Sequence, residues 1–405
     1  MPAPPKRGTA LRQRLAELRG PDVPAAPLDA RALAALAANP GCRRRALLDG
    51  AGVDKAALAQ SLGSPAPFGQ SQFAFMRGNA FEAKVKADGG AELLRLVHGR
   101  LGGGPEPVPG ESSVPDLAAV GPEGRAARTS LALREATEAT VATEEATEAT
   151  VATEEATEAT STGGWTLLDH PMLALDVAGT PAFLEPDAVV VHPDGSWTVV
   201  EIKSFPMIDG SADAAKVGAA ARQAAVYALA LERVAAHMDP APRIRDHVLL
   251  VCPKDFSNLP TASAIDVRKQ LSVARRQLAR LTRIEDIAAA LPEGTTFDVN
   301  RPAPDLTAAV ESVPATYAPE CLAACELAFH CRERSRDEGS VTSLGRSVRG
   351  ELGSLTTVED VLSAATGASG DPADPTVAAL RRAAALRAEA LAGGGASGGA
   401  GGPEC

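Results

Sequence analysis

The chain of 405 residues has few aromatic side chains, few cysteines and no long apolar run. Aromatic residues make up 3% of it, which says little about function. No stretch approaches the roughly 18 apolar residues that a membrane span needs, and the N-terminal region has no apolar run of signal-peptide length. We therefore expect a cytoplasmic protein with no membrane association. A phosphate-binding GxxxxGK(S/T) loop is also missing, so any helicase would have to be a separate protein.

Negative charge dominates but is unevenly placed. The formal net charge is −11, and residues 135–162 hold eight Glu and no Lys or Arg, so the rest of the chain carries only −3. Basic side chains cluster at Arg43, Arg44 and Arg45, and again at Arg268, Lys269, Arg275, Arg276, Arg280 and Arg283. Such patches can follow a phosphate backbone. The alternative is that they are solvated helix faces.

Composition divides the chain into five parts. They are an N-terminal helical and partly disordered region (1–39), a main domain (40–98 and 164–335), a low-complexity acidic insert (99–163), a small helical element (336–370) and a flexible tail (371–405). Within the insert, the unit EATEATVATE starts at Glu135 and repeats at Glu145. It has almost no large apolar side chains, which predicts a disordered or transiently helical segment.

Hydrophobic periodicity in the main domain predicts both helices and strands. Helices are expected at about 29–38, 70–98, 212–238 and 262–290. Strands are expected at 165–168, 172–177, 183–191, 197–203 and 247–252. The pattern predicts an α/β fold with a small mixed sheet and helices on both of its faces.

The densest chemical signal is the segment FLEPDAVVVHPDGSWTVVEIK at residues 183–203. Its central Pro-Asp-Gly predicts a three-residue hairpin loop with the glycine in the left-handed conformation. If the loop is symmetric about Asp194, Asp187 pairs with Glu201 across the two strands, and both project from one face. Lys203 lies two residues beyond Glu201 and shares that face, whereas the residues on either side of Glu201 point into the core.

Two carboxylates at this spacing suit a hard divalent cation. Asp187 and Glu201 would bind Mg²⁺ or Mn²⁺. The cation would polarise a scissile phosphate and lower the pKa of a bound water. Lys203 would hold that water or offset charge on the pentavalent phosphate. The alternative is an edge hairpin that presents a ladder of Glu and Lys to solvent.

Two polar motifs flank the hairpin on predicted helices. Gly78 permits close approach of the backbone, and Glu82 could give a further metal ligand. Gln223 and Tyr227 are four residues apart and therefore lie on one face of the helix that follows the sheet. The alternative for Tyr227 is an aromatic residue of the core.

The order of GxxxE at 78–82, PD at 186–187, ExK at 201–203 and QxxxY at 223–227 resembles the RecB-type branch of the PD-(D/E)XK nucleases. The resemblance implies a restriction-endonuclease-like α/β fold and hydrolysis of DNA phosphodiester bonds with Mg²⁺ or Mn²⁺, often as an exonuclease. It also implies six active-site residues, of which the first three bind the metal: Glu82, Asp187, Glu201, Lys203, Gln223 and Tyr227. The chain departs from the family at Glu82, where the RecB branch usually has His.

Six cysteines in a long cytosolic chain argue for metal binding or reactivity rather than for a disulfide framework. Three of them, Cys321, Cys325 and Cys331, lie in the segment YAPECLAACELAFHCRE. A Zn²⁺ or Cys₄ cluster site needs a fourth ligand. Cys42 is the best candidate because it follows a turn and precedes a basic run, whereas His330 would instead give a Cys₃His zinc site. Cys252 fits a small core residue.

The cysteine order is similar to that of the iron–sulfur nucleases of the RecB type, which include AddB subunits of bacterial helicase–nucleases and CRISPR-associated RecB-like exonucleases. In these proteins one Cys before the nuclease core and three after it usually hold a structural 4Fe–4S cluster, which joins the two ends of the domain. The first gap within the trio is three residues here, where the family usually shows two.

The two resemblances together imply a DNA nuclease with a helical iron–sulfur region, acting in DNA repair, recombination or phage defence. They imply DNA as the partner, together with a separate helicase or defence-system subunit. Two other interpretations stay open. One is a non-catalytic DNA-binding or assembly subunit on the same fold, and the other is a zinc-stapled regulatory protein.

Overall fold

The computed structural model describes residues 7–65, 72–151, 164–255 and 257–394. The chain forms two compact units: Met1–Asp54 with Pro67–Val313, and Lys55–Ala66 with Pro314–Cys405. The boundary after Val313 differs from the one expected after residue 335, so the cysteine-rich segment belongs to the second unit. Residues 152–163 of the predicted insert and 395–405 of the predicted tail lie outside the described residues.

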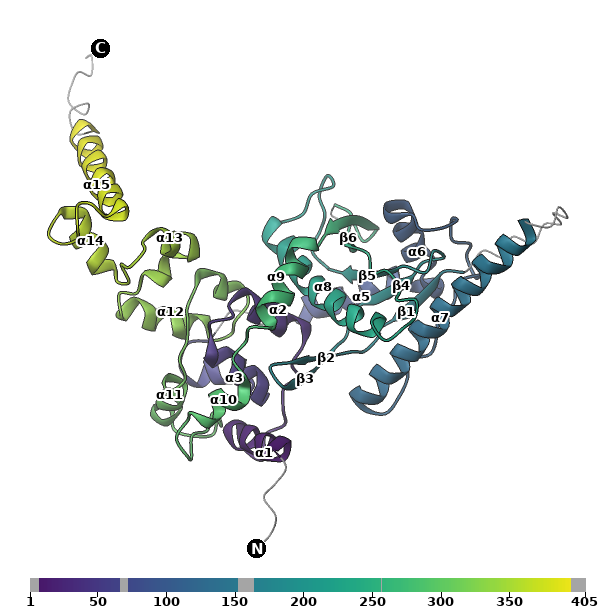
Figure 1. Ribbon diagram of the computed structural model, residues 1–405, viewed down its shortest axis with the longest axis horizontal. Coiled ribbons are helices and arrows are strands. Elements are labelled where there is room, and N and C mark those ends of the chain that lie inside the picture. The colour runs from purple at the N-terminus through teal and green to yellow at the C-terminus, as the bar shows by residue number, and fades with distance from the viewer. Residues whose placement is uncertain (1–6, 66–71, 152–163, 256, 395–405) are drawn as a thin grey trace, which may run out of the picture. The chain divides into compact units, whose positions relative to one another are not determined.

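The first unit contains helices from both ends of its sequence and all of the named strands (Figure 1). Its helices are α1 (Arg7–Arg19), α2 (Ala30–Ala38), α3 (Arg43–Ala51), α5 (Gln72–Val85), α6 (Ala87–Leu101), α7 (Gly121–Val151), α8 (Ala214–Ala235), α9 (Arg268–Leu278), α10 (Ile284–Ala289) and α11 (Ala303–Glu311). Its strands are β1 (Thr166–Asp169), β2 (Leu173–Val177), β3 (Thr180–Leu184), β4 (Ala188–Val191), β5 (Trp197–Ile202), β6 (His247–Pro253) and β7 (Pro260–Asp266).

The main sheet has five strands in the order β1-β4-β5-β6-β7. Strand β5 pairs in parallel with β6, and the other neighbours are antiparallel. The parallel pair is connected through the long helix α8, as a crossover between parallel strands requires. Strands β2 and β3 form a separate antiparallel pair. The expected α/β class with a small mixed sheet is confirmed.

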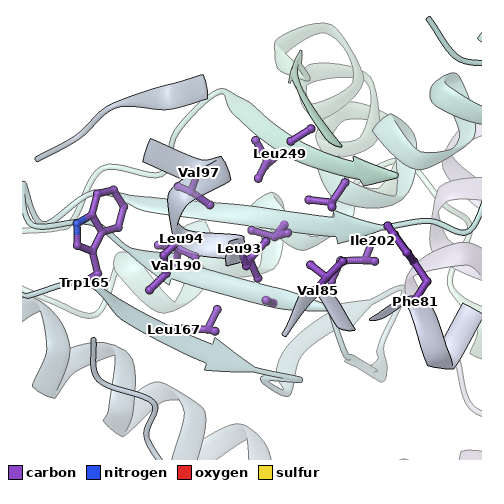
Figure 2. Close-up of a cluster of buried hydrophobic side chains, with 14 residues drawn as sticks. Phe81, Val85, Leu93, Leu94, Val97, Trp165, Leu167, Val190, Ile202 and Leu249 are labelled. Atoms are coloured by element: carbon purple, nitrogen blue, oxygen red, sulfur yellow. The ribbon is translucent and has the colours of Figure 1, made fainter. Parts of the chain in front are cut away.

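Helices cover both faces of the sheet, as the sequence predicts. On one face, the apolar side chains of α5 and α6 pack on alternate residues of the central strands, and Figure 2 shows this layer from Trp165 at one end to Phe81 at the other. Val200 and Ile202 point into this layer. On the other face, Leu250 and Cys252 of β6 pack against Ala220 of α8. Burial of both faces explains why β4 is apolar throughout and why all residues of β5 are buried, Thr198 and Glu201 included.

A tight turn at the start of α6 fixes the approach of this helix to the sheet. Asp88, Gly89 and Gly90 have φ values of +54°, +66° and +77°. A Cβ atom on Gly90 would lie 2.2 Å from Leu167 Cδ2, so a larger residue would displace that side chain of β1, and the positive φ also favours glycine. Lys86 stands directly before this turn, between α5 and α6.

The structure differs from the sequence prediction over the first part of the acidic insert. Residues 121–140 form the first two-thirds of helix α7, which packs against β2, β3 and β4. Thr129, Thr137 and Thr140 are buried on this helix, and Trp197 Nε1 donates to Thr137 Oγ1 at 3.0 Å. Hydroxyl groups can be buried when they are hydrogen-bonded, so a helix poor in large apolar side chains still packs here.

Two other expectations for secondary structure are wrong. Residues 260–266 form the edge strand β7 rather than the start of a helix, and they pair with β6 along their whole length. The predicted strand 183–191 is two strands, because the chain breaks at Glu185-Pro186 between β3 and β4. Pro186 has no N–H to donate to a sheet, which favours the break.

The second unit is helical where it is described. It contains α4 (Lys55–Ser61), the 3₁₀ turns η1 (Pro319–Ala323) and η2 (Val341–Leu344), and helices α12 (Ala328–Asp337), α13 (Arg346–Glu351), α14 (Val358–Thr366) and α15 (Pro375–Gly394). Across the described ranges of both units, no helix has the length and apolar character needed to cross a membrane.

Candidate functional site

The β4–β5 hairpin has the predicted register. Ala188 pairs with Val200 and Val191 with Trp197, which continues one step further to Asp187 opposite Glu201. The loop closes with a hydrogen bond from His192 N to Ser196 O at 2.9 Å. Gly195 has φ +70°, the left-handed conformation expected of it. The turn chemistry and the strand period were therefore sufficient to place the two carboxylates.

Asp187, Glu201 and Lys203 come together at the end of this hairpin. The backbone N–H of Ile202 donates to Asp187 Oδ2 at 2.6 Å. Lys203 Nζ lies 3.8 Å from Asp187 Oδ2 and forms an ion pair with Glu201 Oε1. Glu201 is only 1% exposed, so the alternative of a solvent-facing Glu and Lys ladder is wrong.

Burial sets the electrostatics of the three groups. It raises the pKa of Glu201 to about 7 and raises the pKa of Asp187. Burial alone would lower the pKa of Lys203, but the charges of Glu201 and Asp187 reverse this and raise it. Glu201 Oε2 is buried and has no hydrogen-bond partner. A buried carboxylate oxygen without a partner is costly, and a divalent cation is the kind of group that satisfies it.

Gln223 and Tyr227 lie together on α8, as their spacing predicts. Gln223 Nε2 donates to Tyr227 OH at 3.0 Å, and Tyr227 OH donates to the carbonyl of Glu185 at 3.1 Å. Tyr227 is 4% exposed, as the alternative of a core aromatic residue predicts. Since Glu185 precedes Asp187 by two residues, the tyrosine fixes the backbone that leads into the site.

Glu82 lies against basic groups. Its Oε1 atom is 2.6 Å from Lys86 Nζ and 3.1 Å from His170 Nε2. Burial raises the pKa of Glu82, but the hydrogen bonds with His170 and Lys86 outweigh this and lower it to about 2. A Cβ atom on Gly78 would lie 3.9 Å from Ser204 Cβ, so packing within the chain does not require glycine there.

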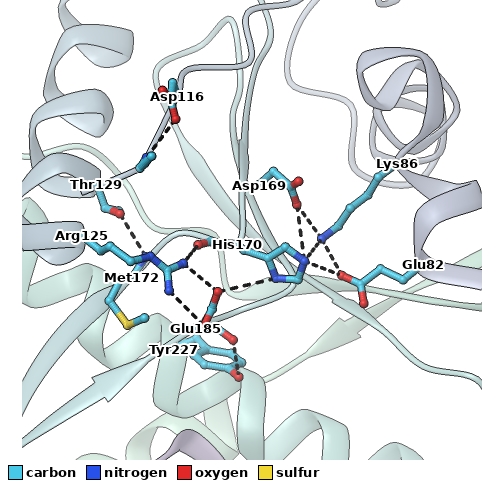
Figure 3. A network of polar contacts seen from close by, with 11 residues as sticks. Glu82, Lys86, Asp116, Arg125, Thr129, Asp169, His170, Met172, Glu185 and Tyr227 are labelled. Carbon is cyan, nitrogen blue, oxygen red and sulfur yellow. Dashed lines mark hydrogen bonds and ion pairs between the residues drawn. The ribbon is translucent and has the colours of Figure 1, made fainter. Parts of the chain in front are cut away.

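Sequence reasoning missed a second layer of polar residues, drawn in Figure 3. His170 follows β1 at φ +45°, and its N–H donates to the Asp187 carbonyl at 3.3 Å. Arg125 of α7 donates to the His170 carbonyl at 3.0 Å and to Glu185 Oε1 at 2.7 Å. The hydrogen bond with Glu82 raises the pKa of His170. A histidine directly after an apolar strand could have indicated His170 as a site residue. No sequence pattern indicated Arg125.

The proposed metal ligands do not form one compact group. Within the described ranges, no three His, Cys, Asp or Glu side chains are placed to hold a metal ion. Asp187 and Glu201 face Lys203, whereas Glu82 faces Lys86 and His170.

The cysteines fall in different parts of the fold. In the first unit, Cys42 is the buried residue before α3, and Cys252 is fully buried in β6, where burial raises the pKa of its thiol to about 12. The prediction of Cys252 as a core residue is confirmed. In the second unit, Cys321 and Cys325 are joined by a backbone hydrogen bond of 2.8 Å, and Cys331 lies in α12. These three are half-buried. His330, which directly precedes Cys331 in the sequence, is buried.

The basic clusters are mostly engaged within the chain. Arg44 and Arg45 are buried, Arg44 Nε donates to Val313 O, and Arg45 pairs with Asp49. On α9, the exposed Arg275 pairs with Glu232 of α8. Arg44 and Arg45 of the first cluster are therefore packing residues, whereas Arg43 is exposed.

No model of a protein family, no curated protein and no solved structure matches this chain. The residues gathered at the hairpin therefore carry the functional assignment by themselves.

Proposed function

We propose that the first unit is a metal-dependent DNA nuclease of the RecB-type PD-(D/E)XK class with a restriction-endonuclease-like fold. The observation that carries the proposal is Glu201. It is a fully buried carboxylate with one oxygen lacking a hydrogen-bond partner, beside Asp187 and Lys203 on an otherwise apolar sheet. A buried acid of this kind stabilises nothing by itself, which points to a functional role.

Asp187 and Glu201 fit a single Mg²⁺ or Mn²⁺ ion because both are oxygen ligands and one buried oxygen has no other partner. When bound, such a cation supplies Lewis-acid polarisation of the phosphodiester. Glu82, on helix α5, assists cation binding through its negative charge, which acts on both Asp187 and Glu201. The Asp187 side chain is aimed by the Ile202 N–H, so the pair is oriented before any ligand arrives.

Lys203 and the Gln223–Tyr227 pair complete the proposed machinery. The Lys203 ammonium lies between the two carboxylates, where it orients the attacking water and offsets negative charge on the phosphate. Tyr227 holds the carbonyl of Glu185 and so fixes the turn into Asp187. Because packing and hydrogen bonds hold the backbone next to Asp187, its carboxylate is preorganised for catalysis.

The second part of the proposal is a structural 4Fe–4S cluster on Cys42, Cys321, Cys325 and Cys331. Its support is the donor set: three half-buried cysteines within eleven residues, one of them on the first turns of α12. Thiolates are the ligands that iron–sulfur clusters require. The proposed setting is DNA repair, recombination or phage defence, with DNA and a separate helicase or defence-system subunit as partners.

The test of the activity is cleavage of linear DNA with Mn²⁺ by wild type and Lys203→Ala. Wild type should cut, and the variant should be slower by at least about 100-fold, the usual size of the loss of one electrostatic group in an active site. Lys84→Ala, which removes an exposed lysine of α5 outside both basic clusters, is the matched control and should cut normally. Equal and absent cleavage by wild type and variant would instead favour the non-catalytic DNA-binding subunit.

The cluster has its own test, on anaerobically purified protein. We expect a broad absorption band near 400 nm and about four iron per chain, both lost in Cys42→Ala and in Cys325→Ala. Cys252→Ala is the control, because Cys252 is a core residue, and it should keep the iron. A colourless protein that contains zinc would contradict the cluster and favour the zinc-stapled interpretation.

A further inference from the structure

The ammonium group of Lys86 lies against polar atoms of three separate residues (Figure 3). Lys86 Nζ lies 2.6 Å from Glu82 Oε1, 2.6 Å from Asp169 Oδ1 and 3.1 Å from His170 Nε2. The two carboxylate oxygens accept from the ammonium group, and His170 Nε2, which donates to Glu82 Oε1, completes the cluster. The Lys86 side chain is only 10% exposed, which is unusual for lysine unless its charge is paired.

Two carboxylates, with an imidazole as a third ligand, are also a suitable ligand set for a divalent transition metal such as Mn²⁺. Here the set surrounds Lys86 instead. We propose that Lys86 is a built-in cation that takes the place of a second metal ion, so that the site uses one divalent cation. This inference rests on the proposed nuclease function.

The Lys86 cluster belongs to the same site as the hairpin acids. The N–H of His170 donates to the carbonyl of Asp187 at 3.3 Å, which joins the two clusters through the backbone. The charge of Glu82 also reaches both hairpin acids, where it contributes to raising their pKa values. In sites with two metals, the second ion lies about 4 Å from the first and offsets charge on the leaving oxygen. The Lys86 ammonium group lies against Asp169 and His170, and its positive charge reaches Asp187.

Charge balance favours one divalent cation over two. The two clusters contain four carboxyl groups, those of Glu82, Asp169, Asp187 and Glu201, and two amino groups, those of Lys86 and Lys203, with His170 against Glu82. Their formal charges sum to −2 with a neutral His170 and to −1 with a protonated one, so one divalent cation suffices in either case and a second would overshoot. Buried charges are costly when they are not balanced, so the lysine removes the electrostatic need for a second ion.

The backbone holds Lys86 in this position. Its N–H donates to the Glu82 carbonyl at 3.0 Å at the end of α5, and the left-handed turn at residues 88–90 follows at once. Gly90 seats this turn against Leu167 of β1, the strand that carries Asp169. The ammonium and one of its acceptors are thus positioned by the same contact between α6 and β1.

The experiment counts Mn²⁺ ions bound to the full chain by electron paramagnetic resonance and titration calorimetry. Wild type should bind one Mn²⁺, and Lys86→Met should bind two, because the variant opens the Glu82, Asp169 and His170 set. Lys84→Met removes an exposed lysine from the same helix and should bind one. The double variant Lys86→Met/Asp169→Asn should return to one ion, which identifies the new site.

Two Mn²⁺ ions in wild type, or one in a folded Lys86→Met, would overturn the inference and leave the nuclease proposal standing. No Mn²⁺ in wild type would overturn both. If Lys86→Met does not fold, Asp169→Asn in the wild-type background decides the question. If Asp169 only accepts from Lys86, Asp169→Asn should change the Mn²⁺ dissociation constant by less than about threefold. If Asp169 is a metal ligand or supports one, the substitution should raise that constant at least about tenfold.

Discussion

Replacing Glu201 by Gln is expected to stabilise the first unit at alkaline pH while abolishing its proposed activity. Glu201 is 1% exposed, and burial raises the pKa of its carboxyl group from 4.5 to about 7. The folded chain therefore holds this proton more tightly than the unfolded chain does. The contribution of the protonated Glu201 to the free energy of unfolding is fully present below pH 4.5. It decreases as pH rises toward about 7 and is lost above that pH.

The size of the effect follows from the shift in pKa. Each pKa unit corresponds to about 1.4 kcal/mol, so the ionised Glu201 lowers the free energy of unfolding by about 3 kcal/mol at pH 8. Gln has nearly the same shape and does not titrate. For a unit of about 300 residues, 3 kcal/mol corresponds to about 5 °C in Tm.

The assay is thermal unfolding at pH 4.5 and pH 8 in the presence of EDTA, with wild type, Glu201→Gln and Glu138→Gln. The Glu201→Gln substitution should raise Tm by about 5 °C more at pH 8 than at pH 4.5. Glu138 is exposed on α7, so its variant should follow wild type at both pH values. An equal effect of Glu201→Gln at the two pH values would refute the reasoning that burial disfavours the charged form.

Three further substitutions test the fold around the site. Gly90→Ala should lower stability by about 2 kcal/mol or more, measured by urea unfolding, because Ala is strained at φ +77° and meets β1. Gly78→Ala should instead raise stability by about 0.5 kcal/mol, since the helix has room for the methyl group; a loss would show that the packing is misassigned. Thr137→Val should cost about 1 to 3 kcal/mol by leaving the buried Trp197 N–H without an acceptor, and faster hydrogen exchange in α7 should accompany it. Unchanged exchange in α7 would contradict the packing of this helix.

The sequence predicted the hairpin site well because the turn type and the strand period that place its residues are local features. A Pro-Asp-Gly loop fixes the register, and a period of two then determines that Asp187 and Glu201 share a face. The pair Gln223 and Tyr227 followed from helical spacing in the same way. The burial of Glu201 was not predictable, since it depends on α8 covering this face of the sheet.

The second layer of the site could not be read from local patterns. Asp169 and His170 reach the site only because β1 lies beside β4, and strand order has no local signal. Lys86 reaches them because α5 packs on the opposite face of the same sheet. Arg125 belongs to α7, a helix whose buried threonines lie partly within the low-complexity repeat, so the sequence did not indicate that this helix packs. Tertiary packing decided all of these contacts, and local propensity decided none of them.

The most direct test of the account measures DNA cleavage against Mn²⁺ concentration for wild type, Asp187→Asn and Asp176→Asn. Asp187→Asn keeps an oxygen that can accept from the Ile202 N–H, so the hairpin should stay folded. Asp176 is an exposed acid on β2 and provides the control. The account predicts Mn²⁺-dependent cleavage by wild type and by Asp176→Asn, with a loss of at least about 100-fold in Asp187→Asn. Cleavage by Asp187→Asn at the wild-type rate, or no cleavage by wild type at any Mn²⁺ concentration, would contradict it.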